Sequence, residues 1–212
     1  MSPRGMKFSQ KHWADQDKNL DHHLERAGQM TEEGLAAVPP PTQPHEVPSP
    51  DDWQNYFRRL GASLPPDYQH FIQRYGTAGF DEFIWVFNPK SASTYFNLID
   101  QAQRLSSADR EMRDAVGRSD FSMRVFPELG GLLPFGNTSN GDVLYWRTGG
   151  DPDEWPICVR GSRDLEWEEF AMNMTGFLDG ILSGRVRCSV FPGDFPSDRP
   201  TLDLPAYLRA TS

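Results

Sequence analysis

The chain has 212 residues, of which 37% are hydrophobic and 12% aromatic, enough for one domain with a buried core and additional extensions. Its formal net charge is −9, and residues 51–180 carry 20 acidic against 12 basic side chains. This negative field repels nucleic-acid phosphates and argues against DNA or RNA binding. Because no apolar run suits a membrane span or a secretory signal, we expect a cytoplasmic protein that does not contact membranes.

Proline divides the chain into segments. Residues 39–50 hold six prolines and predict an extended linker, because proline donates no backbone N–H and disfavours helix in the residue before it. Residues 1–38 precede this linker and predict an extension that is partly helical or mobile. Residues 51–183 form the predicted domain, and residues 184–212 an irregular, proline-rich tail.

Two short helices are expected to open the domain. Ser49 can cap the first, Asp51 and Asp52 favour the positive end of its dipole, and Gly61 ends it. The second helix covers residues 64–76 and begins with prolines. Four apolar residues share one face of it: Tyr68, Phe71, Ile72 and Tyr75.

Further elements follow along the chain. The aromatic stretch 80–89 predicts one strand, and residues 93–105 and 107–117 predict helices with a break near Ser106. Residues 132–146 read as a hairpin, residues 154–161 as a strand, and residues 166–184 as a helix with an acidic first turn. This order predicts an α+β fold, an antiparallel sheet with helices packed on one face.

Motifs for metal, cofactor or covalent chemistry are not found. Adjacent residues of a helix point about 100° apart, so His22 and His23 cannot easily face one ion. No glycine-rich phosphate loop or nucleophile motif is present. We therefore predict no metal, no cofactor and no catalytic residue. Cys158 and Cys188 are expected to be buried free thiols rather than a disulfide.

Carboxylates crowd the region after the predicted hairpin. Paired carboxylates can perform acid–base chemistry or hold magnesium, but turn and helix-start chemistry explains most of them more simply. Asp142 follows Asn140-Gly141 and is expected to fasten a tight turn through backbone N–H groups. We interpret the group as an acidic rim that contacts a partner, together with one tryptophan in a turn. The candidate residues are Asp142, Asp151, Asp153, Glu154, Trp155, Asp164 and Glu166.

Four short patterns occur in an order that resembles the SUKH superfamily. The first is a Leu-Pro-x-x-Tyr helix that ends in Tyr-Gly, and the second is an apolar Leu-x-Pro-Phe-Gly strand. A Gly-Asp with apolar and aromatic residues follows, and a Trp with a Phe-Leu helix closes the series. The matching positions are Leu64, Pro65, Tyr68, Tyr75 and Gly76; Leu132, Pro134, Phe135 and Gly136; Gly141, Asp142, Leu144, Tyr145 and Trp146; and Trp167, Phe170, Phe177 and Leu178.

This resemblance covers residues 51–183 and implies an α+β domain without catalytic machinery. The superfamily includes fungal cell-wall synthesis regulators of the Smi/Knr type and many bacterial immunity proteins, which bind a toxin domain, often a nuclease. Nuclease toxins are basic, so the acidic charge of this chain fits such a partner. We expect a monomer or weak dimer that neutralises a toxin. The alternatives are a regulatory adaptor of the Smi/Knr type and a hydrolase that uses the rim carboxylates.

Overall fold

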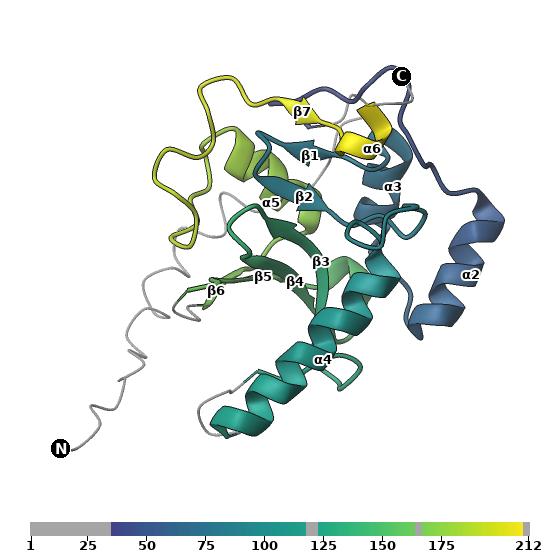
Figure 1. Ribbon diagram of the computed structural model, residues 1–212, viewed down its shortest axis with the longest axis vertical. Coiled ribbons are helices and arrows are strands. Elements are labelled where there is room, and N and C mark those ends of the chain that lie inside the picture. Colours follow the sequence, from purple (N-terminus) through teal and green to yellow (C-terminus); the bar gives the residue numbers. More distant parts are fainter. Residues whose placement is uncertain (1–34, 118–122, 164–166, 210–212) are drawn as a thin grey trace.

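The computed structural model describes residues 35–117, 123–163 and 167–209. Within these ranges the chain forms a seven-stranded antiparallel sheet, ordered β6-β5-β4-β3-β2-β1-β7, with helices packed against it (Figure 1). The predicted α+β class is confirmed. The strands are β1 (Gly79–Phe80), β2 (Ile84–Val86), β3 (Leu132–Thr138), β4 (Val143–Arg147), β5 (Ile157–Arg160), β6 (Trp167–Phe170) and β7 (Leu202–Asp203). The helices are α2 (Pro50–Leu60), α3 (Pro66–Tyr75), α4 (Leu98–Val116), α5 (Met174–Leu182) and α6 (Ala206–Arg209), with a 3₁₀ turn η2 (Pro152–Glu154).

The first two helices begin and end as the sequence predicts. The Ser49 side chain accepts the backbone N–H of Asp52, and the Asp52 carboxylate accepts the N–H of Ser49, which completes a capping box. Gly61 ends α2 in the left-handed conformation, with φ of 79°. The apolar face of α3 is fully buried.

The central hairpin also forms where predicted. Strand β3 pairs with the whole of β4, with a bulge between Pro134 and Gly136. Gly141 closes the turn with φ of 87°, a conformation that favours glycine. Because side chains alternate along a strand, the neighbours Tyr145 and Trp146 point to opposite faces of the sheet.

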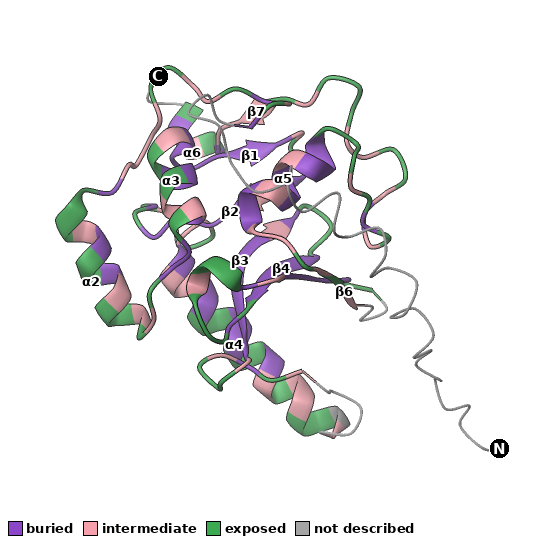
Figure 2. Ribbon diagram, turned by 180° about the vertical axis from the view of Figure 1, so that it is seen from behind, coloured by how far each residue is buried: buried purple, intermediate pink, exposed green. Residues whose placement is uncertain are grey.

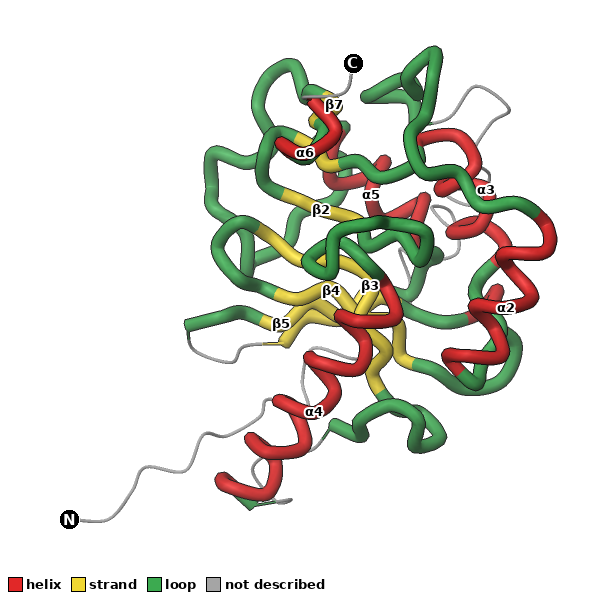
Figure 3. The backbone as a smooth tube through the Cα atoms, turned by 45° about the vertical axis from the view of Figure 1, so that its right-hand side comes forward, coloured by secondary structure: helices red, strands yellow, loops and turns green. Residues whose placement is uncertain are grey.

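Helices cover both faces of this sheet, whereas the sequence predicted one. Trp146 meets the Tyr68 ring of α3 edge-to-face, with centroids 5.0 Å apart, and α5 packs beside α3. On the other face the Tyr145 hydroxyl donates to Asp109 of α4 at 3.0 Å. Helix α4 packs on β3 and extends past the edge of the sheet (Figure 3). Strand β3 is buried almost throughout, as expected for a strand that is covered on both faces.

Three predicted boundaries were wrong. The expected strand 80–89 is a tight hairpin of β1 and β2, turned by Asp81 and Glu82 at φ of 52° and 50°. The expected helix 166–184 is strand β6 followed by α5, which Asn173 caps by accepting the N–H of Gly176 at 2.9 Å. The expected break near Ser106 is absent, because α4 continues through it with Ser106 buried.

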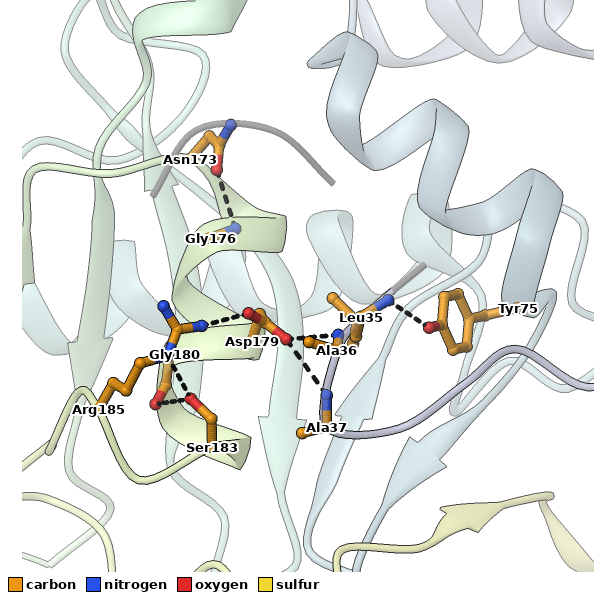
Figure 4. Close-up of polar contacts among 10 residues, drawn as sticks. All are labelled: Leu35, Ala36, Ala37, Tyr75, Asn173, Gly176, Asp179, Gly180, Ser183 and Arg185. Atoms are coloured by element: carbon orange, nitrogen blue, oxygen red, sulfur yellow. Dashed lines mark hydrogen bonds and ion pairs between the residues drawn. The ribbon is translucent and has the colours of Figure 1, made fainter. Parts of the chain in front are cut away.

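The segment before α2 is bound along α3 and α5. Residues 35–38, which we call the strap, bury Leu35 and Val38 in the core. The Tyr75 hydroxyl accepts the N–H of Leu35 at 2.7 Å (Figure 4). The same hydroxyl donates to the carbonyl of Val38 at 2.7 Å. Asp179 Oδ1 of α5 accepts the N–H groups of residues 36 and 37 at 2.7 and 3.4 Å. The chain is therefore held here mainly through its backbone.

The C-terminal tail completes the sheet and meets the linker. Strand β7 pairs with β1, and the Tyr207 hydroxyl of α6 lies 2.7 Å from Ser91 Oγ. The same hydroxyl donates to Glu46 Oε2 at 2.9 Å, and Thr77 Oγ1 donates to that oxygen at 2.6 Å. Figure 2 shows that buried residues line the sheet and the inner sides of the helices, while the outer turns of α2 and α4 are exposed.

Candidate functional site

The connection between β4 and β5 carries three of the predicted rim residues. Asp151, Asp153 and Glu154 are exposed, and we call them the acidic turn. Asp151 caps η2, because its Oδ1 accepts the N–H of Asp153 at 3.1 Å and its carbonyl accepts the N–H of Glu154 at 3.0 Å. No cation in the described part of the chain forms an ion pair with these three carboxylates. Their charges therefore face solvent uncompensated by a direct partner.

Trp155 follows the acidic turn and lies beneath it. Its side chain is buried, with 6% exposure, and its ring centroid is 6.4 Å from that of Trp146. The sequence analysis placed it among the partner-contacting residues because it lies in a turn of Gly, Pro and acidic residues. Its burial leaves little of the ring open to a partner. The residue serves as an anchor that fixes the turn to the core.

The acidic turn rests on rigid elements. The turn η2 packs against α3. Asp67 belongs to α3, and its carboxylate accepts the backbone N–H of Thr175 at 2.9 Å and the Thr175 hydroxyl at 3.2 Å. These bonds join α3 to the first turn of α5. Burial raises the pKa of Asp67, and the negative charge of Asp153 raises it further. The acidic turn is thus close enough to α3 for the charge of Asp153 to influence the protonation of Asp67.

Asp142 has a different environment from the acidic turn. It is 4% exposed, and its Oδ2 accepts the Thr138 hydroxyl at 2.7 Å across the β3–β4 turn. Its Oδ1 accepts the N–H of Ser162, beyond β5, at 2.9 Å. The carboxylate thus fastens the hairpin to the next strand, through one hydroxyl and one backbone N–H. Asp142 is buried, whereas the carboxylates of the acidic turn face solvent.

The remaining rim candidates, Asp164 and Glu166, lie outside the described residues. Their neighbours Glu168 and Glu169 were expected at a helix start but belong to strand β6. Glu168 accepts the N–H and hydroxyl of Ser189 at 2.7 and 2.8 Å, and Glu169 pairs with Arg147. Both carboxylates are therefore engaged within the domain.

A hollow of about 460 Å³ lies beside the same β4–β5 connection, and residues from both ends of that connection line it. The loop 123–131, the last residue of β4 and this connection supply its lining residues: Met123, Arg124, Gly130, Arg147, Thr148, Gly149 and Pro156. Beside Gly130, Leu129 is 75% exposed. The sequence reasoning missed this hollow, because its two walls are far apart in the chain. The doubled glycine before Asp151 was the one local signal of it.

Groups that could serve other chemistry are sparse in the described ranges. No three His, Cys, Asp or Glu side chains there could hold a metal ion together. Cys158 and Cys188 are free and buried, as expected, and burial raises the pKa of each thiol to about 12. No described helix is long and apolar enough to cross a membrane.

Comparison with known proteins identifies one family. No curated protein and no solved structure matches the chain. The family model of the SMI1 / KNR4 family (SUKH-1) matches residues 48–180, which include all elements from α2 to most of α5. This match covers more than half of the chain and confirms the resemblance found in the sequence. The chain therefore belongs to the SMI1 / KNR4 family (SUKH-1).

Proposed function

We propose that this protein binds a basic protein partner through the acidic turn, without catalysing a reaction, and that the partner is a toxin domain which it neutralises. The observation that carries the proposal is the set of three exposed carboxylates on a turn that packs against α3, without a cation partner among the described residues. A net charge of −9 adds a long-range field of the same sign.

Such a surface favours fast association with a positively charged protein. Charges at an exposed rim steer diffusional encounter and can raise association rates by about 10 to 1,000-fold. Packing of the turn against α3 and the anchor of Trp155 in the core limit the ordering entropy that binding would otherwise cost. Nuclease toxins need positive surfaces to attract phosphates, so an acidic inhibitor uses the field that they already carry. An immunity protein benefits directly from fast capture.

The hydrolase alternative has less support from the site. Asp142 is engaged by Thr138 and Ser162, so its oxygens already have partners. The adjacent hollow is lined by two arginines and by no carboxylate. A regulatory adaptor of the Smi/Knr type would share the binding surface and differ only in the partner. The identity of the bound protein distinguishes it from an immunity protein.

This function is tested by a growth-protection experiment in an organism closely related to the native host. The full chain is co-expressed with the protein encoded by the neighbouring gene, and survival and the co-purified complex are both measured. We expect the wild-type chain to restore growth. Asp153→Lys with Glu154→Lys should lose protection. The matched control, Asp194→Lys with Asp198→Lys in the exposed tail, should keep it although it changes net charge equally. Capture of a non-toxic partner without protection would instead support the adaptor.

A further inference from the structure

Two arginines line the hollow beside the acidic turn, within an acidic domain. Arg147 is 44% exposed at its side chain and pairs with Glu169 through one nitrogen. Arg124 is exposed and donates once, to the carbonyl of Leu129 at 2.9 Å. A guanidinium has five N–H donors, so each arginine keeps donors that no described residue uses. Arg124 and Arg147 both line the hollow, and guanidinium groups bind oxyanions by charge-assisted hydrogen bonds.

Gly149 leaves the hollow open without a packing reason. A Cβ atom built at this position meets nothing within 4 Å, and its φ is not in the left-handed region. Gly150 differs, because its φ of 64° favours glycine. Neither crowding nor backbone conformation therefore requires glycine at 149. Because Gly149 has no side chain, this side of the hollow stays open to another chain.

We propose that this hollow receives an aspartate or glutamate side chain of the protein partner. The carboxylate lies between Arg124 and Arg147, and the exposed Leu129 contacts apolar atoms at its side. This inference rests on the proposed function and adds the partner's chemistry. The partner presents an acidic side chain next to the basic surface that meets the acidic turn. A basic protein without such a side chain leaves the remaining N–H donors of the two arginines without a carboxylate acceptor, which gives specificity as well as attraction.

The hollow can be tested on the full chain alone. N-acetylglutamate, N-acetylglutamine and inorganic phosphate are titrated while backbone and arginine N–H signals are followed by NMR. We expect N-acetylglutamate to produce saturable shifts at Thr148, Gly149 and Arg124. Arg124→Gln should weaken this binding roughly tenfold, the loss of one charge-assisted hydrogen bond. Arg199→Gln in the exposed tail should have no effect. Equal shifts with the neutral analogue, or tighter binding of phosphate, would overturn the carboxylate assignment.

Filling the hollow gives a second measurement with a matched control. Gly149→Leu should abolish N-acetylglutamate binding, while Gly193→Leu, where an added Cβ also meets nothing within 4 Å, should leave it unchanged. Both variants should melt at the wild-type temperature. With the identified partner, Gly149→Leu should mainly accelerate dissociation, and the acidic-turn variant should mainly slow association. Unaltered binding of N-acetylglutamate by Gly149→Leu would refute the assignment of the hollow as the carboxylate site. Failure of the acidic-turn variant to affect partner binding would refute only the proposed function.

Discussion

Replacing Asp109 by Asn should lower the free energy of unfolding by about 3 kcal/mol. Asp109 of α4 is 1% exposed and pairs with Arg160 of β5, which is 7% exposed. Its carboxylate also accepts the Tyr145 hydroxyl at 3.0 Å. The asparagine keeps the shape but leaves a buried guanidinium without a counter-charge. Removal of one partner of a buried pair costs about 3–5 kcal/mol, and the low end applies because no cavity forms.

Urea unfolding followed by tryptophan fluorescence measures this loss. Asp114→Asn on the same helix is the control: that side chain is 73% exposed, and the change should cost under about 0.5 kcal/mol. Asp109→Leu with Arg160→Met removes both charges and should cost only about 1 kcal/mol, mainly for the Tyr145 hydroxyl left without an acceptor. If this double variant lost as much stability as Asp109→Asn, the uncompensated charge would not be the cause.

Three further predictions concern single groups. Asp142→Asn should lower the free energy of unfolding in urea by about 2 kcal/mol, because buried donors lose a charged acceptor. The association rate with the partner should stay unchanged. A slower rate would show that Asp142 belongs to the partner-binding surface. The hydrogen bond from the Ser49 backbone, helped by Lys90, lowers the pKa of Asp52 to about 2. At neutral pH the wild type should therefore have a higher melting temperature than Asp52→Asn. This difference in melting temperature should vanish as the pH falls from about 4 to about 2. A difference that does not change with pH would contradict this prediction. Cys158 and Cys188 should react with Ellman's reagent only in denaturant, and fast reaction in buffer would show that burial does not protect them.

Local patterns predicted much of the fold. The capping box of Ser49 and Asp52 and the β3–β4 hairpin formed as expected, because each depends on residues near in sequence. The boundary errors share another cause. Strand β6 exists because β5 offers a pairing edge, and α4 continues through Ser106 because its inner face packs on β3. These are tertiary effects that override local propensity.

The candidate site was predictable only in part. The acidic turn could be found from composition, since aspartate and proline in a short connection favour an exposed turn. Burial of Trp155 could not, because it depends on Trp146 from the preceding strand. The pairing of Arg160 could not be predicted either, because its partner Asp109 comes from a helix 51 residues earlier in the chain. The hollow likewise joins Arg124 and Arg147 from separate segments.

The association rate of the co-purified partner, measured against salt concentration, tests the central claim most directly. We predict a rate that falls steeply with added salt for the wild type and for Asp194→Lys with Asp198→Lys. Asp153→Lys with Glu154→Lys should associate at least tenfold more slowly at low salt and depend on salt less. Identical rates and salt slopes for both double variants would contradict a partner surface at the acidic turn.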